Sequence, residues 1–361
     1  MRIAQVAPLF VRVPPVRYGG TERVISALTE ELVRRGHDVT LFAAGTSKTE
    51  AWLVPSSAKP LWELNTDRAM AYQVSQADQV VKRSDRFDII HWHSGFAHWL
   101  VPSRLRAPSV TTLHCRLDGD PIGRLFMDHP REPVVSISDA QRRPVSSLGS
   151  RWVATVYNGL DLASTYRLGS GEGGYLAFVG RSSPEKGLAT AIRVAIRCRI
   201  PIKIAARLEQ ADIAYHRTEV APLLGHPLVE WLGEATEPEK VQLLGGARAL
   251  LMPVDWDEPF GLAFVEALAA GTPVVTRPLG ALPEIMRDGE HALFGFNEDE
   301  LAEACNRIGE IDRAECRRWA VTRFSTTRMA DDYEAAYERV LRPAIAGDGE
   351  KGVAATGTSS A

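Results

Sequence analysis

The sequence predicts an α/β protein of two domains, each built on a parallel sheet that is covered by helices. The chain has 361 residues, which is enough for two domains of ordinary size. Short apolar segments typical of strands alternate with segments of helical periodicity along most of the chain. A stretch rich in Gly and Ser, 168–174, divides this alternation into two halves.

The first half begins with a buried strand, and a helix follows at 21–35. Val24, Leu28 and Leu32 recur at four-residue spacing there, and Gly36 ends the helix. The expected strands of this half are 3–7, 39–43, 88–93, 109–114, 134–137 and 153–156.

The second half repeats the alternation from residue 175 onward. Its last helix, 328–341, carries Met329, Tyr333 and Tyr337 at four-residue spacing. The expected strands are 175–179, 202–206, 229–232, 249–252 and 274–275. We expect domains at 1–167 and 175–326, a linker at 168–174, a helix at 327–342, and a disordered tail at 346–361.

Composition excludes several classes of protein. The formal net charge of −3 disfavours a general nucleic-acid binder, which would carry a basic excess. The four cysteines show no Cys-x-x-Cys spacing, so we expect reduced thiols in a cytoplasmic protein and no zinc site. They are Cys115, Cys198, Cys305 and Cys316.

Membrane insertion is not expected either. No run approaches the roughly 20 apolar residues that span a bilayer. The apolar stretch at the start is too short for a signal peptide and lacks a small-residue cleavage site. Peripheral contact with the inner face of a membrane stays open.

The most informative segment is 258–266, with the sequence EPFGLAFVE and a glutamate at each end. It predicts a loop followed by a helix that Gly271 and Pro273 end. Unpaired N–H groups at a helix N-terminus suit a phosphate or sugar hydroxyls, and the two carboxylates could accept hydrogen bonds from hydroxyls. The segment therefore indicates a site for a sugar attached to a phosphate. The alternative is that Glu258 caps the helix and Glu266 is solvated.

The spacing of the two glutamates argues against glycosidase chemistry. Eight residues of helix rise about 12 Å, whereas glycosidases place two carboxyl groups roughly 5 to 9.5 Å apart across one bond. Glu258 and Glu266 are better suited to holding two parts of one extended ligand.

The same segment, with the ALAAGTPVV run after it, resembles the donor-site signature of glycosyltransferase family 4. This resemblance implies a retaining enzyme of GT-B fold, with two Rossmann-like domains that face each other across a cleft. It implies that Glu266 holds the ribose and Glu258 the sugar hydroxyls. The backbone N–H groups of Phe260, Gly261 and Leu262 would then bind the sugar or phosphate. The final helix resembles the segment that crosses back to the first domain.

The loop 180–187, GRSSPEKG, follows a strand and leads into a helix. Arg181 and Lys186 lie in this turn, where they can stabilise negative charge on a diphosphate leaving group without a metal. The loop resembles the family's diphosphate-binding loop in residue order. The alternative is a solvated loop.

Two further stretches of the second half bear on the nucleotide. The segment 229–233 resembles the strand that offers its backbone to the nucleobase, which would make Leu232 a base contact. The segment 203–208, KIAARL, departs from the family because the usual Gly-rich turn is missing. What lines that part of the nucleotide pocket is therefore open.

In the first half, Gly19 and Gly20 precede the first helix and allow a loop to approach a ligand closely. With Glu22 and the later segment 35–40, RGHDVT, they resemble the family's N-terminal motif, whose loop lies beside the diphosphate and the acceptor. A dinucleotide oxidoreductase would need Gly-x-Gly-x-x-Gly directly after the first strand, and 8–15 reads PLFVRVPP instead.

Histidines and aromatic residues mark the opposite wall. His114 ends a strand, where parallel sheets place ligand contacts, and the resemblance implies that it contacts the donor sugar. The alternative is a core histidine. His91 and His93 share one strand face, so a metal site is conceivable, but no third ligand stands out. We expect His93, Phe96 and Trp99 to line an acceptor pocket.

The sequence thus predicts a metal-independent glycosyltransferase. It would move a hexose from a UDP- or GDP-linked donor to a small-molecule, glycan or lipid hydroxyl, with no cofactor beyond the donor and with domain closure about the linker. Another GT-B chemistry, such as a sugar phosphorylase or a nucleotide-sugar epimerase, and a non-catalytic nucleotide-sugar-binding protein are the alternatives. The sequence indicates neither the acceptor nor the oligomeric state.

Overall fold

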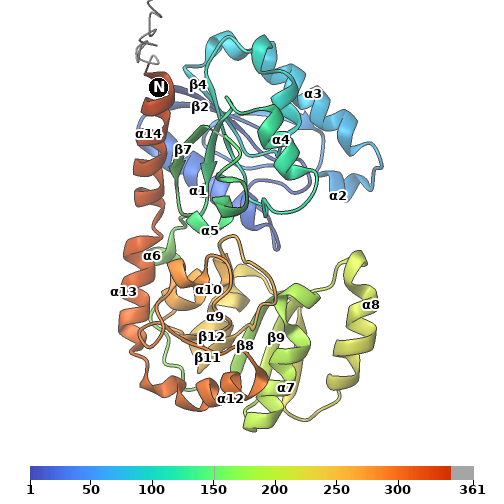
Figure 1. The fold of residues 1–361 in the computed structure, drawn as a ribbon, viewed down its shortest axis with the longest axis vertical. Coiled ribbons are helices and arrows are strands. Elements are labelled where there is room, and N and C mark those ends of the chain that lie inside the picture. The colour runs from blue at the N-terminus through green and yellow to red at the C-terminus, as the bar shows by residue number, and fades with distance from the viewer. Residues whose placement is uncertain (150, 343–361) are drawn as a thin grey trace, which may run out of the picture.

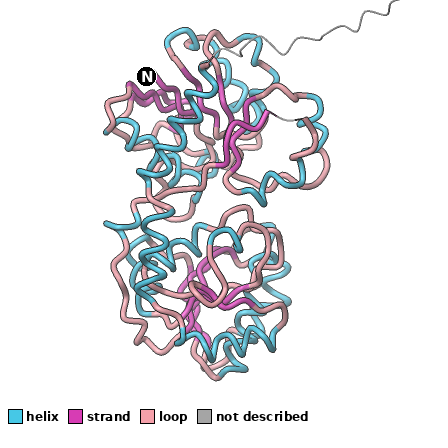
Figure 2. The backbone as a smooth tube through the Cα atoms, turned by 60° about the vertical axis from the view of Figure 1, so that its left-hand side comes forward, coloured by secondary structure: helices cyan, strands magenta, loops and turns pink. Residues whose placement is uncertain are grey.

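The computed structural model describes residues 1–149 and 151–342, so the tail expected at 346–361 lies outside the described residues. It contains two parallel sheets, each in its own half of the molecule (Figures 1 and 2). Helices cover the sheets on both sides, as expected for buried parallel strands. The α/β prediction of two Rossmann-like domains is confirmed.

The first sheet has seven parallel strands in the order β3-β2-β1-β4-β5-β6-β7. Its strands are β1 (Arg2–Val6), β2 (Asp38–Ala44), β3 (Trp52–Ser57), β4 (Ile89–Trp92), β5 (Ser109–Thr112), β6 (Pro133–Ser136) and β7 (Arg151–Thr155). The helices of this half are α1 (Gly20–Arg34), α2 (Leu61–Leu64), α3 (Ala69–Val81), α4 (Ile122–Asp128) and α5 (Asp139–Arg142). The short α6 (Leu162–Thr165) follows and packs against helices of the second half.

The second sheet has six parallel strands in the order β10-β9-β8-β11-β12-β13. Its strands are β8 (Leu176–Arg181), β9 (Ile202–Arg207), β10 (Val229–Gly233), β11 (Ala249–Leu251), β12 (Val274–Thr276) and β13 (Ala292–Phe294). The helices of this half are α7 (Leu188–Cys198), α8 (Ile213–Tyr215), α9 (Glu237–Gly246), α10 (Leu262–Ala269), α11 (Leu282–Ile285), α12 (Glu298–Arg307) and α13 (Arg313–Arg323). The last helix, α14 (Thr326–Leu341), lies against the first half.

Two of these strands, β3 and β13, are missing from the sequence-based list of strands. Both lie at the edge of a sheet. β3 contains Pro55, which lacks a backbone N–H and is tolerated only where a strand has one free edge. β13 has three residues, too few to show a period. Edge position and short length therefore explain both omissions.

The Gly-rich stretch 168–174 does not hang free between the domains. Gly169, Gly171 and Gly173 donate backbone hydrogen bonds to the second domain at 2.9, 3.1 and 2.9 Å. The chain instead passes between the halves twice, near Leu160 and near Phe324, and these two passages are hydrogen-bonded to each other. The stretch 168–174 is therefore part of the second domain's surface and not the crossing itself, and domain closure stays a prediction.

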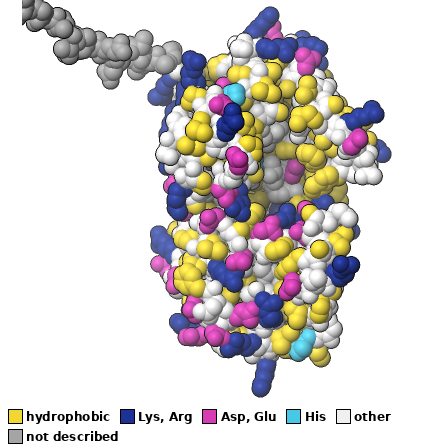
Figure 3. All heavy atoms as spheres, turned by 45° about the vertical axis from the view of Figure 1, so that its right-hand side comes forward, with side chains coloured by type: hydrophobic (Ala, Val, Ile, Leu, Met, Phe, Trp, Pro, Cys, Tyr) yellow, Lys and Arg dark blue, Asp and Glu magenta, His cyan; other side chains and the backbone are white. Residues whose placement is uncertain are grey.

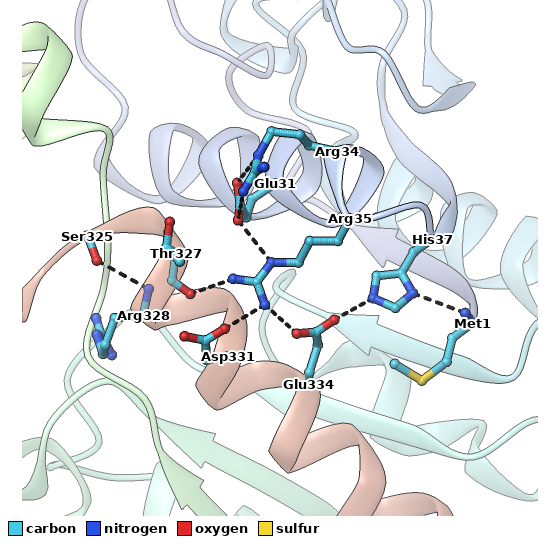
Figure 4. A network of polar contacts seen from close by, with 10 residues as sticks. All are labelled: Met1, Glu31, Arg34, Arg35, His37, Ser325, Thr327, Arg328, Asp331 and Glu334. Carbon is cyan, nitrogen blue, oxygen red and sulfur yellow. Dashed lines mark hydrogen bonds and ion pairs between the residues drawn. The ribbon is translucent and has the colours of Figure 1, made fainter.

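Helix α14 returns to the first domain and packs along α1 and the sheet (Figure 1). Figure 4 shows the polar network that fixes it there. Arg35 donates to Glu31 at 2.9 Å, to Asp331 at 2.7 Å, and also to Glu334, whose other oxygen contacts His37 at 2.6 Å. Part of the RGHDVT motif therefore serves to hold the crossing helix.

Replacing Arg35 tests this anchoring. Its side chain is 17% exposed, so Arg35→Ala leaves partly buried carboxylates without their cation. We expect the free energy of unfolding to fall by about 1.5–3 kcal/mol in urea denaturation. Arg34→Ala is the matched control, since Arg34 is 68% exposed and pairs with Glu31 alone among the described residues. It should cost under about 1 kcal/mol, and equal losses in both variants would contradict the assignment.

Candidate active site

The carboxyl ends of the strands of both sheets border a cavity of about 490 Å³ between the domains. Residues of both halves line it. They include Gly19, Gly20, Glu22 and His114 from the first half, and Arg181, Lys186, Trp256, Glu258, Phe260, Gly261 and Leu262 from the second. Figure 3 shows a hollow between the two halves where acidic and basic side chains gather. Ligands bind at this edge in open α/β sheets.

Arg181 and Lys186 are brought to this cavity by the turn after β8. Arg181 donates to Glu185 at 3.0 Å, with carboxylates of Glu209 and Asp212 at 3.6 and 3.8 Å. Gly187 closes the turn at φ +72°, and a Cβ there would lie 2.0 Å from a backbone oxygen of residue 253. The turn thus needs glycine to hold both cations in place.

Glu258 is buried beside Lys186. Its side chain accepts hydrogen bonds from Lys186 Nζ at 2.5 Å and from Trp256 Nε1 at 2.9 Å. The Lys186 ammonium also lies 4.8 Å from the centre of the Trp256 ring. The cation and the carboxylate therefore neutralise each other in a partly dry wall of the cavity. A diphosphate would compete with Glu258 for Lys186.

Helix α10 points its N-terminus at the same cavity. Gly261 is its N-cap residue at φ +93°, and no side chain caps it among the described residues. Gly261, Leu262 and Ala263 line the cavity, so the first N–H groups of the helix are available there. The predicted end of this helix is confirmed, because Gly271 follows it at φ +74°.

Glu266 lies in the middle of α10 and lines an adjoining pocket of about 160 Å³. Its carboxylate contacts Arg23 of the first domain and Lys240 of α9, the latter at 2.6 Å. Burial alone would raise the pKa of Glu266, but the charges of Arg23 and Lys240 outweigh it and lower the pKa to about 2. Glu266 is therefore ionised, and a contact between the two domains occupies it.

Glu258 and Glu266 thus lie in two neighbouring pockets and have different partners. These pockets share Gly19, Gly20 and Leu262 in their walls, so one extended ligand could occupy both. The expectation that the two glutamates hold two parts of one extended ligand stays a prediction.

Glu22 is the most perturbed acid on the opposite wall. It is buried in the first turn of α1 and lines the cavity, with no ion-pair partner among the described residues. Burial raises the pKa of Glu22 to about 7. The cavity therefore contains a carboxyl group that exchanges a proton near neutral pH.

His114 lines the cavity, whereas the three expected acceptor residues do not. His93 is buried and contacts His114 at 2.9 Å. Trp99 is 2% exposed in a core cluster, and Phe96 packs edge-on against it. The acceptor assignment of Trp99 is thereby corrected, because its ring fills the interior of the first domain.

No group of three His, Cys, Asp or Glu with metal-site geometry occurs in 1–149 and 151–342.

Leu232 lies outside the two pockets described above. It is on the edge strand β10, 46% exposed, in a separate hollow beside Tyr175 and Lys203. The pairing of β10 with β9 shifts register between Trp231 and Gly233, so Leu232 has no partner residue on β9. The pocket beside Glu266 is lined by residues 234 and 235 and not by Leu232, and the base contact of Leu232 stays a prediction.

Arg207 is the last residue of β9, the strand after which the family's Gly-rich turn is missing. It ends β9 beside Arg181 in strand register and lines the pocket of Glu266. Its guanidinium lies 4.9 Å from the ring centre of Tyr18 and 4.4 Å from that of Trp62, both in the first domain. A cation–π contact thus spans the two domains at the edge of the site.

Sequence reasoning missed Arg23, Lys240, Trp256 and the role of Arg207. Arg23 follows the Gly19-Gly20 loop by less than one helical turn, which was an available signal. The others are single residues whose place depends on tertiary contacts, for Trp256 the one with Lys186.

Two facing Rossmann-like domains with the site between them form the GT-B architecture of glycosyltransferases. A solved glycosyltransferase involved in avilamycin A biosynthesis, AviGT4, superposes with a TM-score of 0.69 at 25% identity and covers 94% of this chain and 98% of its own. Anabaena HepE, solved in complex with UDP and glucose, superposes with a TM-score of 0.73 at 17% identity, over 94% and 99% of the two chains.

Family models match both halves. Residues 18–164 match Glycosyltransferase Family 4, and residues 168–321 match Glycosyl transferases group 1. The chain belongs to glycosyltransferase family 4 and is a glycosyltransferase. Phosphatidyl-myo-inositol mannosyltransferase of Mycolicibacterium smegmatis is 27% identical, over 95% of this chain and 93% of that protein. Glycogen synthase of Mycobacterium tuberculosis is 26% identical, over 89% of each chain.

Among the described residues, no helix is long and apolar enough to cross a membrane.

Glu22 provides a pH-dependent test. Its folded-state pKa lies above the unfolded value of 4.5, so the folded state loses stability as the pH rises from 4.5 through 7. Glu22→Gln removes this loss. Relative to wild type it should gain up to about 3 kcal/mol in urea unfolding at pH 8 and little at pH 5. Glu63→Gln, at an exposed site, should show no such pH dependence. A pH-independent difference in Glu22→Gln would contradict the assignment.

Proposed function

We propose that this chain is a retaining, metal-independent glycosyltransferase that moves a hexose from a UDP- or GDP-linked donor to a hydroxyl acceptor. The observation that carries the proposal is the arrangement of charges along two adjoining pockets. Arg181, Lys186 and the N-terminus of α10 surround one end, and Glu266 with Lys240 lies at the other. This order suits a diphosphate between a sugar and a ribose.

The relatives support this choice of donor. One of them is named a mannosyltransferase and another a glycogen synthase, and HepE was solved in complex with UDP and glucose. We assign the ribose to Glu266, the diphosphate to Arg181 and Lys186, and the sugar hydroxyls to Glu258 and His114. The loop at Gly19 and Gly20 would lie beside the diphosphate.

The chemistry follows from the positions of the cations. The bond between the anomeric carbon and the phosphate oxygen breaks, and the acceptor oxygen bonds to the same face of that carbon. The acceptor proton passes to the leaving phosphate. Arg181, Lys186 and the α10 N–H groups stabilise the negative charge that develops on that phosphate, without a metal. Glu258 is held by Lys186 and Trp256, so its role is to orient the sugar.

The acceptor enters from the first domain in this proposal. Its class, a small molecule, glycan or lipid, is left to experiment. A donor screen by thermal shift, followed by mass spectrometry of the products formed in a cell extract, would identify both substrates. If no nucleotide or nucleotide sugar raises the melting temperature, the proposal fails.

Lys186 is the sharpest single test. Lys186→Ala removes a cation from the leaving phosphate, so transfer and slow donor hydrolysis should fall by about 10²–10³-fold in kcat. Lys82→Ala, at a position 68% exposed on the first domain, should leave both unchanged. Urea unfolding of each variant separates lost chemistry from lost stability. Donor hydrolysis at the wild-type rate in Lys186→Ala would overturn the assigned role.

Product analysis separates the alternatives. A retaining transferase should yield the donor's anomer, read by NMR coupling constants, with activity unaffected by EDTA. Inorganic phosphate should not replace the acceptor, whereas a phosphorylase would form a sugar phosphate and an epimerase would alter the donor with no acceptor. Tight donor binding with neither hydrolysis nor transfer would indicate a non-catalytic binding protein.

A further inference from the structure

A continuous chain of hydrogen bonds runs from the cavity through the interior of the first domain to helix α14. It begins at His114 and includes His93, Gln5, Tyr337, His91, Thr112 and Tyr333. The successive distances are 2.9, 2.8, 3.0, 2.8, 2.7 and 3.1 Å. Except for His114, every member is at most 3% exposed. We call this set the interior chain.

The members come from four elements. Gln5 is on β1, His91 on β4, Thr112 on β5, and the two tyrosines are on α14; His93 and His114 follow the ends of β4 and β5. One end of the interior chain therefore meets the ligand cavity and the other lies on the helix that returns from the second domain. Of these residues, only His114 is assigned a contact with the donor above.

Gln5 sets the direction of the interior chain on the cavity side. Its amide nitrogen donates to the Tyr337 hydroxyl, so its carbonyl oxygen faces His93 Nε2. An oxygen can only accept, and His93 Nε2 must therefore carry the proton. The buried ring is neutral, because burial lowers the pKa of His93 well below its usual range. A neutral imidazole has one N–H, which leaves His93 Nδ1 as an acceptor.

The same logic extends to the cavity. His93 Nδ1 can only accept, so His114 Nε2 must donate to it across 2.9 Å. Burial lowers the pKa of His114 to about 4, so this ring is also neutral with one N–H. Its Nδ1 is then unprotonated, and it has no hydrogen-bond partner among the described residues.

We propose that Gln5 and His93 are positioning residues that hold His114 as its Nε2–H tautomer, so that Nδ1 accepts a hydrogen bond from a donor-sugar hydroxyl. Tyr337 completes the device: its hydroxyl proton points to His91 Nδ1 at 2.8 Å, so its oxygen is left to accept from the Gln5 amide nitrogen. The hydrogen bond from a sugar hydroxyl to His114 rests on the function proposed above. The tautomer of His114 is a property of the protein without ligand. If the Gln5 amide were reversed, every donor on the path to His114 would reverse and Nδ1 would carry the proton.

The tautomer can be read directly. In protein labelled with ¹⁵N-histidine, long-range ¹H–¹⁵N correlation spectra distinguish Nε2–H from Nδ1–H rings, and His114→Gln assigns the signal. We expect the Nε2–H pattern for His114 in the wild-type protein at pH 7. An Nδ1–H or doubly protonated ring would overturn the proposal without bearing on whether a nucleotide sugar binds.

Two isosteric variants on α14 test how the tautomer is set. Tyr337→Phe removes the acceptor of the Gln5 amide, which frees the amide to turn and donate to His93. The His114 signal should then shift toward Nδ1–H. Tyr333→Phe is the matched control, since Tyr333 is equally buried on the same helix but bonds to Thr112 at the far end. It should leave the signal unchanged, and the same spectrum in both variants would refute the positioning role.

Kinetics supply the second readout. The hydrogen bond between the sugar and His114 Nδ1 is made in both the ground state and the transition state, so its loss weakens donor binding and not the chemical step. Tyr337→Phe should therefore raise the KM for the donor about 2- to 10-fold and leave kcat nearly constant. Tyr333→Phe should leave both constants unchanged. A change in tautomer with no change in KM would show that His114 does not contact the sugar. Absence of any donor binding by wild type would instead refute the proposed function and leave the tautomer result standing.

Discussion

The double crossing of the chain between the domains is the constraint on which the site depends. Leu160 donates to Phe324 at 3.0 Å and accepts from Thr326 at 3.2 Å, so the two passages run side by side as a short parallel bridge. Gly159 allows this approach, since a Cβ there would lie 2.4 Å from the Ser325 oxygen. Because both passages meet at one point, the two halves are joined there and their strand ends face each other across the cavity. A cavity lined from both sides follows from this geometry.

Charge balance is the second consequence of assembling a site from two halves. A buried carboxylate is costly unless a cation lies beside it. Glu258 has Lys186, and Glu266 has Lys240 together with Arg23 from the opposite domain. Glu237 contacts the same two cations as Glu266, so the charges balance before any ligand enters. A phosphate that takes a cation away leaves a carboxylate free to accept from a hydroxyl, so one ligand with both groups can replace these pairs at little electrostatic cost.

The sequence predicted those features that lie in one continuous segment. The 258–275 stretch contains its own helix start, helix end and both glutamates, and Arg181 and Lys186 share one turn, so local chemistry was enough to place them. Arg23 and Arg207 act through partners more than 40 residues away in the chain, so only folding shows their role. Trp99 was misplaced because an aromatic residue after a strand can fill a core as well as line a pocket. The sequence alone does not distinguish these two.

The interior chain shows how a buried polar network can be stable and still serve a site. Each member needs a partner, because an unpaired polar group in a dry interior costs about 1–3 kcal/mol. Tyr333 and Tyr337 supply partners at one end, and they reach the first domain because α14 packs there with its buried face and is held by Arg35. At the other end His114 Nδ1 has no partner within residues 1–149 and 151–342. The position left open is at the cavity, so a ligand hydroxyl that donates there completes the network, and the helix that joins the domains also prepares the wall that meets the ligand.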